Sequence, residues 1–155
     1  MDKYYIALYK LGVKNEHILK LIREYDKELI PQIFNGNFSV FNDDIDWLEY
    51  KILLENPTKI RNAINAADNI LRINQRKGIH TALYGTADYP CYLRDIDNPP
   101  AIIYYKGSNP NNGYKKTIAC IGTRHPTRFG FNAVNYLVPQ WVNEGFAIVS
   151  GLASG

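Results

Sequence analysis

The chain has 155 residues, of which 46% are hydrophobic and 21% are charged, and its formal net charge is +3. This composition suits one domain or two small ones around a hydrophobic core, and the mild positive charge does not by itself indicate nucleic-acid binding. No run of about 18 apolar residues is present to span a membrane, and the N-terminus MDKYYIALYK lacks the apolar core of a signal peptide. We therefore expect a cytoplasmic protein without a membrane span.

The cysteines and histidines do not suggest a disulfide framework or a metal site. Cys91 and Cys120 form no C-x-x-C pair, and the three histidines are far apart in the sequence. We expect both thiols to stay reduced, and we predict neither a metal nor a cofactor.

Residues 1–78 show helical periodicity, which predicts a small all-helical domain. The first helix ends at Gly12, and a second helix follows a predicted N-cap at Asn15. Pro31 makes one continuous helix over residues 26–34 unfavourable, and a turn is expected at residues 35–37.

Two further helices complete this predicted domain. The first is expected after an N-cap at Asn42, with Ile45, Leu48 and Ile52 along its apolar side. The second is long: it begins at the Asn56–Pro57 pair and ends at Gly78.

The residues between the first two helices allow two interpretations. Leu11, Gly12 and Val13 can form a helix-hairpin-helix, in which backbone amides of the hairpin bind DNA phosphates. The alternative, which we favour, is that Gly12 simply ends a helix, as glycine commonly does.

Residues 79–107 contain two predicted strands, IHTALY and AIIYYKG, on either side of a proline-rich turn segment. Tyrosines are frequent here, and they can either stack on bases or pack as half-buried strand residues; we favour packing. The tyrosines concerned are Tyr89, Tyr92, Tyr104 and Tyr105.

Residues 117–155 predict a strand, a helix, a second strand and two glycine-rich turns, which is a β-α-β unit with parallel strands. The runs TIACI and FAIVS are uncharged, as expected for strands covered on both faces. Because the crossover is expected to be right-handed, the turns at 122–130 and 151–155 should leave the same edge of the sheet.

That edge is the predicted binding site. A turn that opens a helix offers free amides and the positive end of the helix dipole, which together suit a phosphate. No acidic residue lies between Asp97 and Glu144, so this stretch carries positive charge only. The predicted phosphate- or DNA-binding residues are Gly122, Thr123, Arg124, Arg128, Gly130, Ser150, Gly151 and Gly155, with Lys106, Lys115 and Lys116 as auxiliary basic residues.

Nucleotide-binding and catalytic signatures are absent from the sequence. Neither G-x-G-x-x-G nor G-K-[ST] follows a predicted strand, and no G-x-S-x-G elbow occurs. We therefore predict binding and no catalytic residue.

These motifs resemble those of the DNA-processing protein A family (DprA, also called Smf). The resemblance rests on IACIGTR, on FG at the start of a helix, on IVSGLASG, and upstream on YPCYLRDIDNPPAIIYYKG. It covers residues 89–155 and is much weaker before them. Family members continue after the second glycine turn with further helices and strands, so we expect this chain to hold the first part of a Rossmann-like domain.

The resemblance implies an α/β fold in two domains: residues 1–78, helical and sterile-alpha-motif-like, and residues 79–155, the beginning of the Rossmann-like DNA-binding domain. It also implies binding of single-stranded DNA in natural transformation and recombination, with protection of incoming strands and help in loading the RecA recombinase. A homodimer of the full-length protein is implied too.

Two alternatives remain open at this point. A Rossmann-like nucleotide phosphoribohydrolase of the LOG type has a related architecture and also presents glycine turns to a phosphate. The chain can instead be an interaction module in which only the helical domain folds well and the sheet portion is vestigial.

Overall fold

The computed structural model describes residues 2–38, 45–111 and 116–152. By their contacts the residues form two compact units, Met1–Asn111 and Asn112–Gly155, called here the N-terminal and C-terminal units. The fold is mixed α/β, as predicted, with helices, an antiparallel strand pair and a parallel strand pair.

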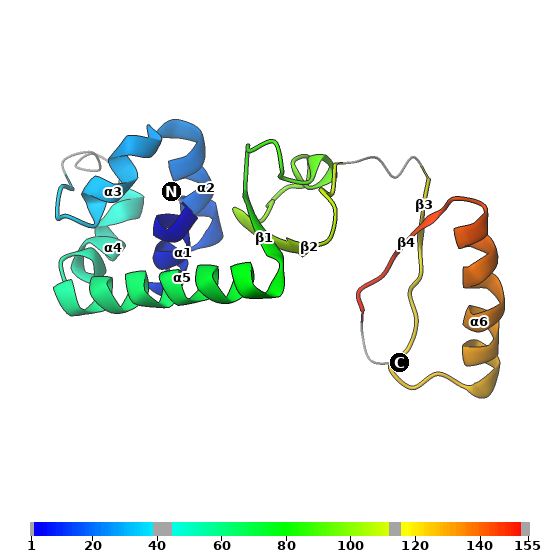
Figure 1. Ribbon diagram of the computed structural model, residues 1–155. Coiled ribbons are helices and arrows are strands. Elements are labelled where there is room, and N and C mark those ends of the chain that lie inside the picture. Colours follow the sequence, from blue (N-terminus) through cyan, green and yellow to red (C-terminus); the bar gives the residue numbers. More distant parts are fainter. Residues whose placement is uncertain (1, 39–44, 112–115, 153–155) are drawn as a thin grey trace. The chain divides into compact units, whose positions relative to one another are not determined.

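The helices of the N-terminal unit surround a single hydrophobic core (Figure 1). Tyr5, Ile6 and Leu8 of the first helix are at most 2% exposed, and this helix packs along the longest one. The helical elements are α1 (Asp2–Lys10), α2 (Asn15–Glu24), the 3-10 turn η1 (Lys27–Leu29), α3 (Ile30–Ile33), α4 (Ile45–Leu54) and α5 (Pro57–Lys77).

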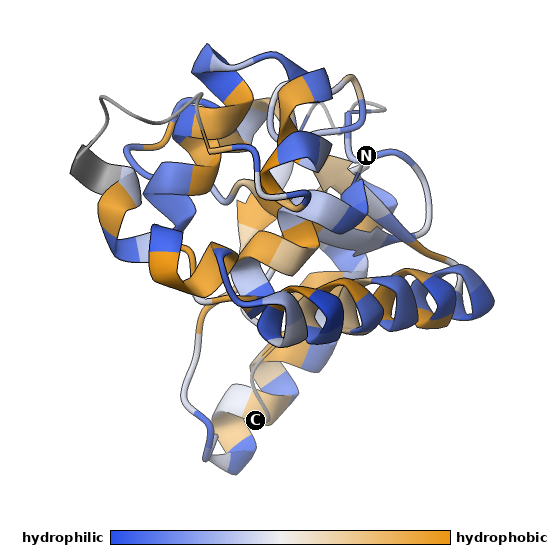
Figure 2. Ribbon diagram, turned by 90° about the vertical axis from the view of Figure 1, so that its left-hand side faces the viewer, coloured by the Kyte–Doolittle hydropathy of each residue, from blue (hydrophilic) through white to orange (hydrophobic). Residues whose placement is uncertain are grey.

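Local sequence explains where α5 begins and ends. The Asn56 side chain accepts a hydrogen bond of 3.0 Å from the amide of Lys59, and Pro57 occupies the first helical position. Gly78 ends the helix with a φ of 63°, a left-handed conformation that a side chain disfavours. Hydrophobic and hydrophilic residues alternate along the helices (Figure 2), as expected for amphipathic helices that bury one side.

Two predictions about the helices were wrong. Asn15 is the first residue of α2 and not its cap; Lys14 takes that position, without a side-chain hydrogen bond. Leu48 and Ile52 face solvent, with 63% and 76% of their surface exposed, because α4 buries Trp47 and the residues at helical spacing from it. The predicted cap Asn42 lies outside the described residues.

The connection between α1 and α2 does not present free amides. The amide of Gly12 donates to the carbonyl of Tyr9, and that of Val13 donates to the carbonyl of Leu8, both over 3.0 Å. The next amide, that of Lys14, donates to the Tyr50 hydroxyl. Because these donors are occupied within the chain, the helix-hairpin-helix interpretation is not supported.

Strands β1 (Ile79–Leu83) and β2 (Ile102–Lys106) form an antiparallel pair, with Ile79 opposite Lys106 and Leu83 opposite Ile102. Between them lies the 3-10 turn η3 (Cys91–Leu93). By contacts this hairpin belongs to the N-terminal unit, where Leu83 and Ile102 join the core. The domain boundary at residue 78 rested on the change in periodicity, and it stays a prediction.

The C-terminal unit contains β3 (Thr117–Ala119), α6 (Arg128–Asn143) and β4 (Ala147–Val149). The two strands are parallel, with Ile118 opposite Ile148, so the predicted β-α-β unit is confirmed. The helix begins at Arg128, three residues before its predicted apolar side at Phe131, because the Thr127 hydroxyl caps it.

Burial distinguishes the two units. Among the described residues of the C-terminal unit none is buried, and Ile121 and Phe129 are 94% and 82% exposed. The two strands and one helix therefore leave much of their apolar surface uncovered.

Candidate functional site

The two turns predicted to bind phosphate leave the sheet side by side. Strands β3 and β4 run parallel in register, and the amide of Cys120 extends the pairing by donating 2.8 Å to the carbonyl of Val149. The turn after β3 and the turn after β4 therefore start from the same edge, where the carboxyl ends of parallel strands form ligand sites.

Each turn is tightened by a hydroxyl group. The Thr123 Oγ1 accepts a hydrogen bond of 3.2 Å from the amide of His125. The Ser150 Oγ accepts one of 3.0 Å from the amide of Leu152. Leu152 has a positive φ of 50°, an uncommon conformation for a leucine. The predicted site residues Thr123 and Ser150 thus shape equivalent local turns.

The N-terminus of α6 retains donors for an anion. Thr127 accepts a hydrogen bond of 3.3 Å from the amide of Gly130, so that predicted donor is already engaged. Within the described part of the chain, the amides of Arg128 and Phe129 donate no hydrogen bond. These two amides, together with the positive end of the helix dipole, face the space before the helix.

The charges near this helix start are all positive. Arg124 and Arg128 are exposed, and neither forms an ion pair with any described residue. Glu144 is the one acid in the sequence of this unit, and it lies at the opposite end of α6, about 24 Å away at 1.5 Å per residue. A positive charge in the first turn of a helix opposes the helix dipole by about 0.3–1 kcal/mol, so a bound anion would stabilise this arrangement.

Gly122 has open space around it. A Cβ built at this position would meet no atom within 4 Å, and the residue does not have a positive φ. Neither packing among the described residues nor backbone conformation requires glycine here. Close approach of a ligand to the backbone is one reason for a glycine in such a turn. Gly151 is likewise exposed, with open space where a Cβ would stand.

The other predicted basic residues are not brought to this edge. Lys116 precedes β3, where its carbonyl accepts from the amide of Ala147 and its ammonium lies 5.4 Å from the ring of Phe146. It therefore lies at the amino ends of the strands, opposite the turns. Lys106 belongs to β2 in the N-terminal unit. Lys115 and Gly155 lie outside the described residues.

The four tyrosines between residues 89 and 105 that were considered for base stacking differ in their burial. Tyr89 is fully buried, and its hydroxyl donates 2.8 Å to the carbonyl of Pro100, while Tyr105 stacks on His80 with ring centroids 5.0 Å apart. Packing is therefore confirmed for these two. Tyr92 and Tyr104 are 81% and 46% exposed, which leaves their rings accessible.

The described residues offer neither a metal site nor a membrane-spanning helix. No cluster of three or more His, Cys, Asp or Glu side chains there has an arrangement that would hold a metal ion. None of the helices in the described part has both the length and the apolar character needed to cross a bilayer. Cys91 and Cys120 are free thiols.

Part of this chain is similar in sequence to known DNA-processing proteins. The family model described as DNA recombination-mediator protein A matches residues 80–155. DNA processing protein DprA of Bacillus subtilis (strain 168) is 37% identical over 86 residues, which cover 56% of this chain and 29% of that protein. Protein Smf of Synechocystis sp. (strain ATCC 27184 / PCC 6803 / Kazusa) is 34% identical over 98 residues, 61% of this chain and 24% of its own length.

These alignments cover less than a third of each curated relative. No solved structure matches the chain. The family match begins at His80, the second residue of β1, and includes both glycine turns and α6. Through residues 80–155, the chain is similar to the DNA-processing protein A (DprA/Smf) family.

Proposed function

We propose that this protein binds single-stranded DNA at the edge formed by the turns after β3 and β4. One observation carries the proposal: Arg124 has no ion pair among the described residues, and it lies four residues before a helix start whose first two amides donate no hydrogen bond. A phosphate group would accept hydrogen bonds from these amides and from the guanidinium, whose fork geometry suits two phosphate oxygens.

A strand is favoured over a free nucleotide because Arg124 and Arg128, four residues apart around the turn, can contact different phosphates. No acid interrupts residues 98–143. The relatives' names, DNA processing protein DprA and Protein Smf, together with the recombination-mediator family, support a role in DNA processing and recombination. We propose no catalytic residue and no cofactor.

We propose that the protein acts in the cytoplasm during natural transformation. It would protect incoming single strands and help to load the RecA recombinase onto them, as a homodimer in the full-length protein. These roles follow from the family resemblance, and no residue of this chain is assigned to a RecA or dimer contact.

The test is a titration with oligothymidylates of increasing length at several salt concentrations. Affinity should rise with length and fall steeply with salt, since each phosphate neutralised on a single strand contributes about 0.7 to the slope of log affinity against log salt. Affinity that does not depend on length would contradict the proposal.

A nucleoside monophosphate is the matched control ligand. Its hydrolysis, without any oligonucleotide binding, would instead identify a phosphoribohydrolase of the LOG type. If neither ligand binds and partner proteins bind residues 1–78 alone, the helical interaction module would be the better description.

A further inference from the structure

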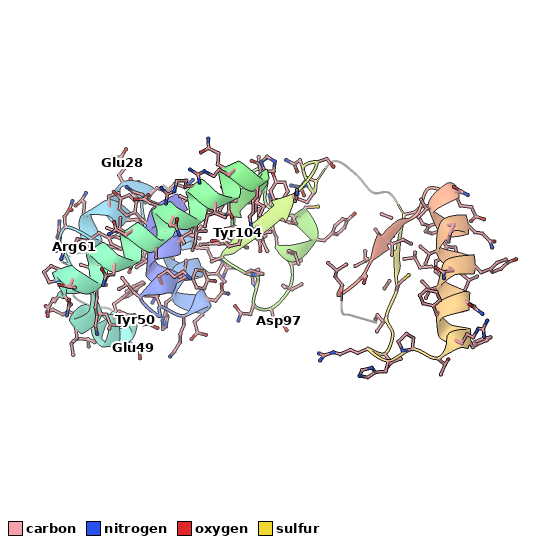
Figure 3. The ribbon with its side chains drawn as sticks, turned by 60° about the horizontal axis from the view of Figure 1, so that its bottom comes forward. Glu28, Glu49, Tyr50, Arg61, Asp97 and Tyr104 are labelled. Atoms are coloured by element: carbon pink, nitrogen blue, oxygen red, sulfur yellow. The ribbon has the colours of Figure 1, made fainter. Side chains whose placement is uncertain are left out.

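A second candidate site lies in the N-terminal unit, between α1, α5 and β2. The pocket has a volume of about 310 Å³ and is lined by Ile6, Tyr9, Lys10, Ile70, Asn74, Ile102 and Tyr104. Tyr104 lies beside α5 (Figure 3). A volume at the lower end of the range for ligand pockets suits one small flat group rather than a large cofactor.

Apolar and aromatic residues line most of the pocket. Two of them, Ile6 and Ile102, are 2% and 8% exposed. Tyr9 and Tyr104 are 37% and 46% exposed, so their rings remain available at its side. Burial raises the pKa of both tyrosines, and they are therefore neutral near pH 7. An apolar slot with neutral aromatic rings is suited to stacking a planar, uncharged ring.

Asn74, which lines this pocket, has a polar group without a partner. The Asn74 Nδ2 is buried and donates no hydrogen bond to any described residue. An unpaired amide donor of this kind is costly, and a carbonyl oxygen on a bound ring would satisfy it. Planar rings that carry carbonyl oxygens at their edges include the pyrimidine and guanine bases.

One lysine lines the pocket, and two others lie near its lining residues on β2 and α5. Lys10 lines the pocket, and Lys106 follows Tyr104 by two residues on the same face of β2, about 6.6 Å further along the strand. Lys77 follows Asn74 by three residues on α5, which places it on the same side of that helix. Asp2, one helical turn from Ile6, is the acid whose charge acts on Tyr104. Three lysines against one aspartate favour a ligand with phosphate groups.

We propose that this pocket binds one unpaired nucleobase of a single-stranded nucleic acid, with the ring against Tyr104 and the adjoining phosphates at Lys10 and Lys106. The inference rests on the proposed DNA function and adds a second contact, which lies outside the glycine turns. Lys106 would belong to this second site, whereas it does not belong to the site at the sheet edge of the C-terminal unit.

Photocrosslinking tests this assignment directly. An oligothymidylate substituted with 5-bromodeoxyuridine is irradiated with the 155-residue chain, and crosslinked peptides are mapped by mass spectrometry. A crosslink in the peptide that contains Tyr104 is expected. Crosslinks confined to residues 120–130 would overturn the pocket while leaving the proposed function intact, and a chain that binds no oligonucleotide would contradict both.

Substitutions give an independent test in the same chain. Tyr104→Ala should weaken oligonucleotide binding about five- to 150-fold, the range for loss of one base–aromatic stack, whereas Tyr104→Phe should retain most of the affinity. Tyr92→Ala is the matched control, because Tyr92 is exposed and lies outside the pocket. An abasic oligonucleotide should bind the parent and Tyr104→Ala equally. Equal loss with the abasic strand, or no loss with the normal one, would overturn the proposal.

Discussion

The Oδ1 atom of Asn15 accepts a hydrogen bond of 2.8 Å from the backbone amide of Ala101, 86 positions further along the chain. The Nδ2 atom of the same side chain donates 2.8 Å to the carbonyl of Pro99 and 2.8 Å to Asn98 Oδ1. Because a backbone amide only donates and a carbonyl only accepts, these contacts fix the orientation of the Asn15 amide. One side chain thus holds the segment before β2 against the start of α2.

Asn15→Ala is therefore expected to lower the free energy of unfolding by about 1–3 kcal/mol, the range for partly buried polar groups left unpaired. Asn15→Asp should be at least as harmful, because a carboxylate would face the oxygens of Asn98 and Pro99. Urea denaturation measures both. Asn62→Ala is the control, since Asn62 is exposed on α5; equal effects of Asn15→Ala and Asn62→Ala would contradict this role.

Ionisation of Tyr50 is expected to lower the stability of the fold in alkali. Its hydroxyl accepts from the amide of Lys14 and lies 2.9 Å from His17 Nδ1, next to Glu49 (Figure 3). Burial first, and then the hydrogen bond with Glu49, raise the pKa of Tyr50 to about 12. The unfolded chain, with an ordinary tyrosine pKa near 10, loses this proton before the folded chain does, so stability is complete below about pH 10 and falls between about pH 10 and 12.

The expected contribution of Tyr50 over that interval is about 2–3 kcal/mol, from two pKa units at 1.36 kcal/mol each. Tyr50→Phe keeps the ring and removes the titration, so its unfolding free energy should change less between those pH values. Thermal melts of both proteins across the interval measure the difference. An identical pH profile for parent and variant would show that Tyr50 titrates normally.

Hydrogen exchange should distinguish the two units. The N-terminal unit has a continuous core, whereas none of the described residues of the C-terminal unit is buried, and exposed apolar surface promotes association. Amides of residues 116–152 should therefore exchange faster than those of α1 and α5, or be protected only as protein concentration rises. Equal protection of both units in a proven monomer, at every concentration, would contradict this expectation.

Substitution of Gly122 distinguishes a contact with the ligand from a role in packing. Because a Cβ would meet no atom within 4 Å, Gly122→Ala should change stability by no more than about 0.5 kcal/mol. It should nevertheless weaken DNA binding by about 1–3 kcal/mol, the usual cost of an extra methyl group in a close contact.

Gly145→Ala is the matched control, and its expected effects on stability and on DNA binding are the opposite of those of Gly122→Ala. Gly145 has a φ of 84° after α6, at the helix end away from the turns, so the variant should lose stability and keep its intrinsic DNA affinity. Binding isotherms and thermal melts of the two variants are compared. Similar behaviour of Gly122→Ala and Gly145→Ala would show that Gly122 is a structural residue.

Local signals in the sequence predicted much of the fold. The Asn56–Pro57 start and the Gly78 stop of α5, and the β-α-β unit of residues 117–149, were predicted from capping residues and periodicity and are confirmed. The apolar side of α4 was predicted wrongly, because Leu48 and Trp47 are adjacent and both fit a helical stripe. Only packing against the other helices determines which of the two is buried.

Sequence patterns could not predict the long-range polar contacts. Asn15 has a residue type typical of an N-cap, but its side chain bonds to a segment more than eighty residues away. The pocket residues Tyr9, Lys10 and Asn74 carry no motif, because two separate helices, α1 and α5, bring them together. The glycine turns were found because parallel strands dictate a common edge, and the occupied amide of Gly130 follows from a cap at Thr127 that was not predicted.

The most direct test of the central claim is the affinity of Arg124→Ala for oligothymidylate as a function of salt, measured in a chain extended to the complete family domain. Arg124→Ala should lose about 1–3 kcal/mol of binding free energy, lower the salt slope by about 0.7 and leave the melting temperature nearly unchanged. Arg124→Lys should recover part of the loss, and Lys116→Ala, at the opposite strand ends, should have little effect. Parental affinity in Arg124→Ala, or a melting temperature that falls in step with affinity, would contradict the assignment of Arg124 to a phosphate contact.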